Sequence, residues 1–186
     1  MASSDAHIVV EGLTMKYGSF LIQRDLTFEI KRKDVFVIMG GSGCGKSTLL
    51  KHLIGLNSPA AGRVLYNGES FWDATTAQRE ALLRRMGILY QKGALWTSMT
   101  LAENVSMPIR QYTKLSESEI RDIAEYKLAL VGLSGFEDYY PSEISGGMQK
   151  RAGLARAMAL DPEVLFLDRK STRLNSSHTD ISRMPS

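Results

Sequence analysis

The chain has 186 residues, of which 44% are hydrophobic and 23% are charged, and these proportions are ordinary for a globular domain. Its longest apolar runs fall well short of the ~20 residues that a membrane-spanning helix needs, and its N-terminus lacks the basic start and apolar run of a secretory signal. The single cysteine, Cys44, excludes an internal disulfide and suits a reducing compartment. We therefore expect a cytoplasmic protein that reaches a membrane only through a partner.

Residues 7–39 predict β-structure. Ile8–Val10 is a short apolar run, and Leu26–Ile30 alternates between apolar and polar side chains. Val35–Met39 is a continuous apolar run with several β-branched side chains. Such a run is typical of a strand that is buried on both faces of a parallel sheet.

A helix and a hairpin turn are predicted next. Apolar side chains at positions 49, 50, 53 and 54 have helical spacing after a glycine-rich turn, and Gly55 predicts the end of this helix. Arg63–Tyr66 predicts a strand, and Asn67-Gly68 predicts a tight turn after it.

The pattern from about Ala74 to Leu160 is mostly helical. Ser116 and Glu119 have the spacing of a capping box, and Gly132 predicts the end of the helix that this box begins. Residues 141–147 interrupt the pattern, and Met148 starts a further helical stretch.

A last apolar run, Val164–Leu167, follows a turn at Asp161-Pro162. Strands, a glycine-rich turn, a helical insert and another buried strand together indicate an α/β nucleotide-binding core.

The glycine-rich turn carries the strongest chemical signal. It matches G-x-x-x-x-G-K-[ST] at every position and lies between a predicted buried strand and a helix. Glycines let backbone N–H groups surround phosphate oxygens, and the helix N-terminus adds partial positive charge. We expect Lys46 to contact the β- and γ-phosphates of a nucleotide and Ser47 to coordinate Mg²⁺. The alternative is a glycine-rich turn that matches by chance. The expected ATP-binding residues are Gly40, Gly41, Ser42, Gly43, Cys44, Gly45, Lys46, Ser47 and Thr48.

A second candidate anion site precedes the helix that starts near Met148. Taken alone, the run Ile144-Ser145-Gly146-Gly147-Met148 would usually be a helix N-cap. After a phosphate loop and before an apolar strand, it resembles the signature of the ATP-binding-cassette family. The resemblance implies that Ser145, Gly146, Gly147 and Met148 contact the γ-phosphate of ATP held by an opposite subunit. It therefore implies a head-to-tail homodimer in the presence of ATP.

Three further positions match this family. Tyr17 matches the aromatic residue that stacks on adenine, although alone it would be a half-buried strand tyrosine. Gln91 matches the glutamine that contacts Mg²⁺ and the attacking water, where the alternative is a solvated loop residue. Asp168 matches the aspartate that binds Mg²⁺ at the end of a strand. The resemblance thus implies ATP and Mg²⁺ as cofactors.

One branch of the family is more similar than the others. The chain resembles the ATPases of mammalian-cell-entry (Mla) type lipid transporters at four places: residues 91–100, Glu103-Asn104-Val105, Pro108 and Lys150-Arg151. This resemblance implies an ATP-hydrolysing subunit at the cytoplasmic face of an inner membrane. It implies an integral-membrane permease as partner, and indirectly a periplasmic protein that carries phospholipid. The alternatives are a soluble cassette ATPase acting on nucleic acid or the ribosome, and a small-molecule kinase.

The end of the chain departs from the family. Asp168 is followed by Arg169 where the family has a glutamate that polarises water, and His178 does not follow an apolar strand as the switch histidine does. No catalytic residue beyond Lys46 and Gln91 is then retained. Residues 168–178 and 182–186 are identical to the translation of a DNA adapter used in short-read sequencing, so we expect residues 168–186 to be a non-native tail. Asp168 is either native by coincidence or part of this tail. This tail carries net charge +2 of the chain's +3, so the basic excess does not indicate nucleic acid as a partner.

The predicted fold class is α/β: a P-loop NTPase core with a parallel sheet, an N-terminal antiparallel β subdomain and a helical signature subdomain. We expect residues 1–167 to form a C-terminally incomplete ATPase cassette, with the helical subdomain at about residues 92–150.

Overall fold

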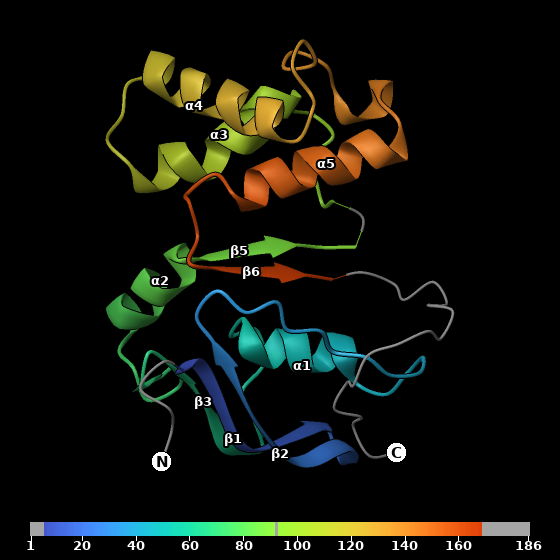
Figure 1. Ribbon diagram of the computed structural model, residues 1–186, viewed down its shortest axis with the longest axis vertical. Helices are drawn as coiled ribbons and strands as arrows, with labels where there is room; N and C mark the ends of the chain where they lie inside the picture. Colours follow the sequence, from blue (N-terminus) through green and yellow to red (C-terminus); the bar gives the residue numbers. More distant parts are fainter. Residues whose placement is uncertain (1–5, 92, 169–186) are drawn as a thin grey trace. The chain divides into compact units, whose positions relative to one another are not determined.

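The structure is a computed structural model that describes residues 6–91 and 93–168. The described chain forms two compact units, residues 6–82 and residues 83–168, and each contains a sheet of its own (Figure 1). The predicted α/β class, with an antiparallel sheet, a parallel sheet and a helical part, is confirmed. The expected tail, with Arg169 and His178, lies outside the described residues apart from Asp168.

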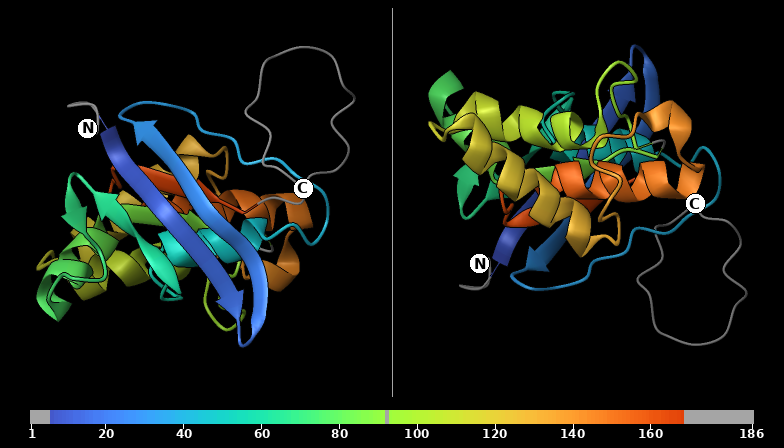
Figure 2. Two further views of the ribbon diagram at one scale, coloured as in Figure 1. Left: turned by 90° about the horizontal axis from the view of Figure 1, so that it is seen from below. Right: turned by 90° about the horizontal axis from the view of Figure 1, so that it is seen from above.

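The first unit is built on an antiparallel sheet in the order β2-β1-β3-β4. The long strands β1 (Ala6–Tyr17) and β2 (Phe20–Lys31) form a hairpin, which is seen from below in Figure 2. β1 also pairs with β3 (Ala61–Tyr66), which turns through Asn67 and Gly68 into the short β4 (Glu69–Ser70). Both turn residues have left-handed backbones, with φ of 51° and 84°, as the predicted Asn-Gly turn requires.

Helix α1 (Lys46–Leu53) belongs to this unit and confirms the helix predicted after the glycine-rich turn. It buries Leu49 and Leu53, and the Tyr66 hydroxyl of β3 donates a hydrogen bond to the Leu53 carbonyl. The chain leaves the helix at Gly55, which has φ of 73° and lies against the ring of Phe71. The end of α1 is therefore fixed to the antiparallel sheet.

The prediction of a buried strand at Val35–Met39 is wrong for the described structure. Residues 34–41 form no regular element, and the side chains of Val35 and Val37 are 92% and 56% exposed. A strand exists only where a neighbour accepts its backbone hydrogen bonds. Neither sheet of the described chain pairs with this segment. The composition of residues 35–39 favours a strand, but a strand forms only where a neighbouring strand pairs with it.

The second unit contains a parallel pair of strands, β5 (Met86–Leu89) and β6 (Val164–Leu167), in register from Met86 opposite Val164 to Leu89 opposite Leu167. β6 was predicted. β5 lies inside the stretch that was predicted to be mostly helical, directly after helix α2 (Thr76–Arg84). Four residues are too few to show a period, and the strand is fixed by its pairing with β6.

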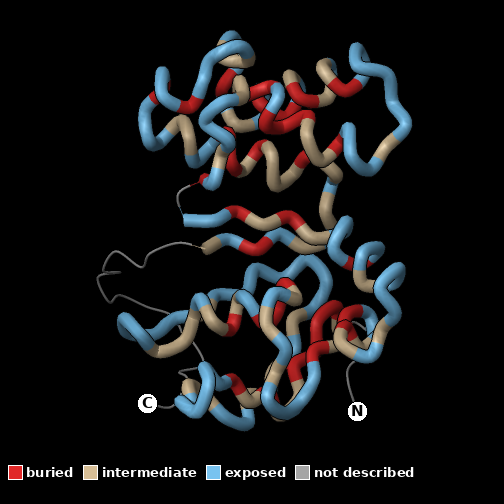
Figure 3. The backbone as a smooth tube through the Cα atoms, turned by 180° about the vertical axis from the view of Figure 1, so that it is seen from behind, coloured by how far each residue is buried: buried red, intermediate tan, exposed pale blue. Residues whose placement is uncertain are grey.

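Three helices make the core of the second unit: α3 (Leu101–Tyr112), α4 (Glu117–Leu130) and α5 (Gly146–Ala157). Thr100 and Ser116 form capping boxes before α3 and α4, and the one at Ser116 was predicted. The buried residues gather where these helices face one another (Figure 3). Among the described residues, no helix has the length and apolar character required to cross a bilayer.

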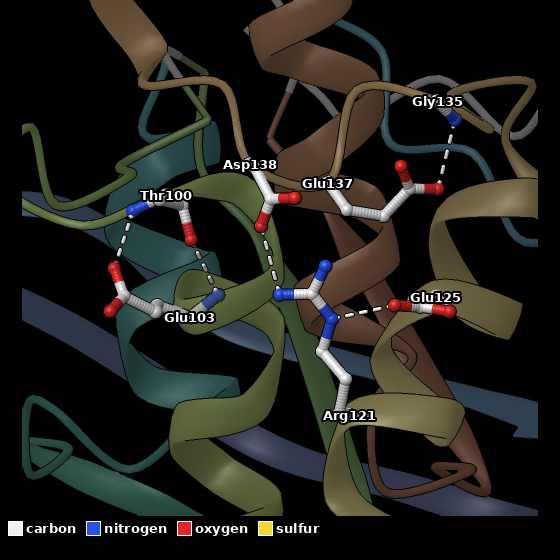
Figure 4. A network of polar contacts seen from close by, with 7 residues as sticks. All are labelled: Thr100, Glu103, Arg121, Glu125, Gly135, Glu137 and Asp138. Carbon is white, nitrogen blue, oxygen red and sulfur yellow. Dashed lines mark hydrogen bonds and ion pairs between the residues drawn. The ribbon is translucent and has the colours of Figure 1, made fainter. Parts of the chain in front are cut away.

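The loop between α4 and α5 is fastened to the start of α3 by backbone hydrogen bonds, and to α4 by Arg121, whose ion pairs are drawn in Figure 4. The amides of Leu101 and Ala102 donate to the carbonyls of Tyr139 and Glu137, both at 2.9 Å. Arg121 adds ion pairs to Asp138 at 2.9 Å and to Glu125 at 2.6 Å, but these groups are exposed and contribute little. The backbone bonds therefore fix the path of the loop as it enters the short 3₁₀ helix η1 (Pro141–Glu143) and then α5.

Candidate functional site

The glycine-rich motif at residues 40–48 forms a tight loop that leads into α1. Gly43 and Gly45 have φ of 84° and 96°, in the left-handed region that favours glycine, and Gly45 is the N-cap of the helix. A Cβ atom at Gly40 would lie 2.5 Å from the Cys44 sulfur, and one at Gly45 would lie 2.7 Å from a methyl group of Ile22. Glycine is thus favoured by the backbone conformation at Gly43 and Gly45 and by the close side chains at Gly40 and Gly45.

Lys46 closes this loop. Its Nζ donates to the carbonyl oxygens of Gly40 at 2.7 Å and Gly41 at 2.6 Å. The ammonium group therefore lies within the curve of the loop. The first turn of α1 carries no acidic residue, so nothing there opposes an anion at the helix start. The next residue, Ser47, is exposed in the same turn.

The open side of the loop fits a phosphate group. A Cβ atom at Gly41 or Gly43 would meet no atom within 4 Å, so the backbone there is uncovered. Uncovered N–H groups, an ammonium group and a helix N-terminus are the groups that bind phosphate in proteins. This part of the sequence prediction has a matching geometry.

Helix α1 is held at its other end by His52, whose side chain is 1% exposed. The Nδ1 atom lies 2.8 Å from the carbonyl oxygen of Asn57, so Nδ1 carries the proton and donates. Burial lowers the pKa of the imidazole, and the hydrogen bond to Asn57 opposes this shift. Nε2 has no hydrogen-bond partner among the described residues, so a second proton there would be unpaired.

Tyr17 ends β1, opposite Phe20 in the register of the hairpin, and its side chain is 77% exposed. The ring is accessible, but adenine stacking by Tyr17 stays a prediction.

Gln91 and Asp168 follow the two parallel strands of the second unit. The Asp168 amide donates to the Leu89 carbonyl at 2.9 Å, which extends the β5–β6 ladder by one bond. Gln91 comes two residues after Leu89 and is exposed. Both residues therefore lie at the carboxyl edge of the parallel sheet, the edge at which α/β proteins bind ligands.

The signature residues form the start of α5. Ser145 is the N-cap, and its hydroxyl accepts the amide of Met148 at 3.2 Å. Gly146 and Gly147 are exposed, and a Cβ atom at Gly146 would meet nothing within 4 Å. The N-cap interpretation of Ser145 is correct. The first backbone amides of the helix are still open to an anion.

Sequence reasoning missed the residues that support these motifs. The Gln149 side chain donates to the carbonyls of Pro141 at 2.8 Å and Ile144 at 3.4 Å, which fixes the turn into α5. Arg156 donates to carbonyls of the loop that follows Gln91. The one sequence signal was Gly153, a poor helix former in the middle of a predicted helix.

Within the described ranges, no group of three or more His, Cys, Asp or Glu residues could hold a metal ion. A site made of one carboxylate, a hydroxyl and nucleotide phosphates is the kind that Mg²⁺ uses in proteins. Ser47 and Asp168 have that chemistry, but they belong to different units.

Comparison with known proteins gives a consistent result. A family model described as "ABC transporter" matches residues 23–171. The chain is 46% identical over 172 residues to the probable ribonucleotide transport ATP-binding protein mkl of Mycobacterium leprae, covering 92% of this chain and 50% of that protein. It is 42% identical over 165 residues to the intermembrane phospholipid transport system ATP-binding protein MlaF of Haemophilus influenzae, covering 89% of this chain and 62% of that protein. The chain thus spans about half to two thirds of the length of these relatives.

Solved structures of ATP-binding cassettes have a similar fold. The fold matches cbiO1 of Clostridium perfringens, part of the ABC transporter complex cbiONQ, with a TM-score of 0.79 and 29% identity over 92% of this chain and 68% of that one. It also matches a dimeric ATP-binding cassette in a post-hydrolysis state bound to ADP and Pi, with a TM-score of 0.79 and 28% identity over 91% of this chain and 76% of that one.

The burial of His52 predicts that the stability of the protein depends on pH. The folded pKa lies below the ordinary value of 6.5, so the unfolded chain binds more protons between these two values. Stability should therefore be fully present above pH 6.5 and should fall as the pH drops towards the folded pKa, by at most ~1.4 kcal/mol per pH unit. Urea denaturation from pH 7.5 to 5 measures this. In His52→Asn, which keeps a donor for Asn57 but does not titrate, the decline should be reduced. An unchanged pH dependence in this variant would exclude His52 as its source.

Proposed function

The chain belongs to the ABC transporter family, and we propose that it binds ATP with Mg²⁺ through residues 40–48. The observation that carries this proposal is the position of the Lys46 ammonium group, 2.7 and 2.6 Å from two carbonyls of a glycine loop at the start of α1. An anionic phosphate can accept the hydrogen bonds that the Lys46 ammonium group now donates to these carbonyls. It can bind the uncovered amides of Gly41 and Gly43 at the same time. Tyr17 supplies the exposed ring for the adenine.

Nucleotide phosphates are commonly bound together with Mg²⁺. The Ser47 hydroxyl, the Gln91 amide oxygen and the Asp168 carboxylate are the groups we assign to hold it. Bound there, the ion would supply positive charge that neutralises the phosphate oxygens. The chain's own contribution is to place the Lys46 cation and the loop amides around the same phosphates.

Lys46→Ala should weaken binding of Mg²⁺-ATP at least ~100-fold, because contacts to charged groups contribute about 1.5–3 kcal/mol each and Lys46 makes more than one. Fluorescence titration with a labelled ATP analogue measures the affinity. Lys51→Ala is the matched control, since Lys51 is an exposed lysine of the same helix. Equal affinity of Lys46→Ala and the unsubstituted chain would overturn the phosphate-loop assignment.

We propose that the start of α5 binds the γ-phosphate of ATP held by a second copy of the chain. The exposed amides of Gly146 and Gly147 and the Ser145 hydroxyl provide the donors, and the helix N-terminus provides partial positive charge. A solved relative that is a dimeric cassette supports the dimer.

Hydrolysis should be slow in this chain. Arg169 follows Asp168 where the family has a glutamate, and a cation cannot accept the proton of the attacking water. Loss of a group that positions and polarises the nucleophile reduces the rate by about 10²–10⁴-fold. A nucleotide-bound dimer should therefore persist with hydrolysable ATP. The rate of phosphate release, measured in the same sample, should be minimal.

Ser145→Arg should prevent this ATP-dependent dimer and leave ATP binding by the monomer nearly unchanged, because the new side chain covers the helix start. Light scattering with and without Mg²⁺-ATP measures the dimer. Ser118→Arg, at an exposed position of α4, is the control. A dimer of undiminished stability in Ser145→Arg would exclude the role of Ser145 across the interface.

At the level of the whole protein, we propose an ATPase subunit that energises a transporter of phospholipid, peripheral at the cytoplasmic face of an inner membrane. Its partners would be an integral-membrane permease and, indirectly, a periplasmic lipid-binding protein. The relatives named MlaF support lipid as cargo. The relatives named mkl carry the word ribonucleotide, so both cargoes are to be compared in reconstituted vesicles.

The second candidate is a soluble cassette ATPase that acts on nucleic acid or the ribosome. Affinity purification from cells separates the two: a co-purifying integral-membrane protein supports the transporter, and co-purifying RNA with no membrane protein supports the soluble machine.

A further inference from the structure

The loop that contains Gln91 is held to helix α5 by Arg156. The guanidinium group donates from Nη1 to the Ala94 carbonyl at 2.7 Å and from Nη2 to the Gly93 carbonyl at 3.2 Å. The loop itself turns sharply, since Gly93 and Ala94 have φ of 75° and 50° and the Gly93 amide donates to the Tyr90 carbonyl at 2.8 Å. Two consecutive carbonyls of this turn thus point to one side chain of α5.

The same turn touches the backbone of α5. A Cβ atom at Gly93 would lie 2.8 Å from the Gln149 carbonyl oxygen, and one at Gly153 would lie 2.8 Å from the Gly93 Cα atom. The loop and the helix are therefore as close as two backbones without side chains allow. Arg156 is one turn further along α5 from Gly153, so its two hydrogen bonds continue this contact.

The environment of Arg156 differs from that of a surface arginine. Its side chain is partly buried, and burial lowers the pKa of the guanidinium group. Among the described residues no carboxylate pairs with it, and its hydrogen bonds go to main-chain carbonyls. A partly desolvated cation whose hydrogen bonds go to backbone oxygens fixes those oxygens in place.

We propose that Arg156 is a positioning residue that fastens the Gln91 loop to α5, so that Gln91 and the Ser145 turn move as one body. This inference rests on the proposed function, in which Gln91 contacts Mg²⁺ and Ser145 contacts a phosphate. Its structural half, the attachment of the loop, can be tested without any nucleotide.

Arg151 provides a matched control on the same helix. Its Nη1 donates to the carbonyls of Val131 at 2.9 Å and Gly132 at 2.8 Å, which belong to the turn after α4. Arg156 and Arg151 therefore make the same kind of contact with two different loops.

The first experiment compares amide hydrogen exchange, without nucleotide, in Arg156→Met and Arg151→Met. In Arg156→Met the Gly93 amide should exchange at least ~10-fold faster, because two charge-assisted hydrogen bonds are lost from its turn. In Arg151→Met the Gly93 amide should be unchanged and the Gly132 amide should exchange faster. Unchanged exchange at Gly93 in Arg156→Met, or equal acceleration in both variants, would overturn the proposal.

Arg156→Lys is a milder variant that retains the charge. A single ammonium group cannot reproduce the planar fork that reaches both carbonyls, so Gly93 should still exchange faster than in the unsubstituted chain. Full recovery with lysine would show that charge, and not the two-carbonyl contact, holds the loop.

The second experiment measures ATP affinity with and without Mg²⁺. Arg156→Met should reduce the gain in affinity that Mg²⁺ gives, as Gln91→Ala should, and Arg151→Met should not. A general loss of stability would lower ATP affinity with and without Mg²⁺ alike, and so would not reduce the gain in affinity that Mg²⁺ gives. If the unsubstituted chain binds no ATP, the proposed function fails and the exchange experiment still decides whether Arg156 holds the loop. If ATP binds and Arg156→Met leaves the Mg²⁺ gain intact, the positioning role is wrong.

Discussion

Helix α5 can lie against strand β5 and the loop after it only because glycine occupies the points of contact. A Cβ atom at Gly87 in β5 would lie 2.2 Å from the Ala157 carbonyl oxygen of α5. One turn before Ala157 in α5, a Cβ atom at Gly153 would lie 2.8 Å from the Cα atom of Gly93 in the loop. A further turn earlier, the Gln149 carbonyl oxygen of α5 lies 2.8 Å from where a Cβ atom of Gly93 would be. These positions of α5 are spaced by four residues and so lie on one face of the helix. Interiors packed to this density leave no room for an added methyl group without movement of a backbone.

This close contact determines where the functional groups of the second unit lie. α5 begins at Ser145, and β5 leads into Gln91, while Asp168 extends β6 beside it. Gln149 and Arg156 then fix the loops at the two ends of the contact. The signature turn and the edge of the parallel sheet are thereby held by contacts with the same helix.

Features that depend on a few neighbouring residues could be predicted from the sequence. The phosphate loop, the capping box at Ser116 and the turn at Asn67-Gly68 each follow from local backbone requirements. Features that depend on distant partners could not. Val35–Met39 has the composition of a buried strand but pairs with no strand of the described chain, and β5 is too short to have a recognisable period. The partners of Arg156 lie 62 and 63 residues earlier in the chain, beyond the reach of any local pattern.

The most direct test of this account compares two glycine-to-alanine substitutions in α5. Alanine is the better helix former by about 1 kcal/mol, so helix propensity alone predicts that Gly153→Ala is stabilising. The contact with Gly93 predicts the opposite, a loss of about 1–3 kcal/mol from overpacking, while Gly146→Ala, which meets no atom within 4 Å, should be neutral or stabilising. Chemical denaturation gives the free energy of unfolding of each variant. Opposite signs at the two positions would support the close contact as the constraint on this unit, and a stabilising Gly153→Ala would contradict it.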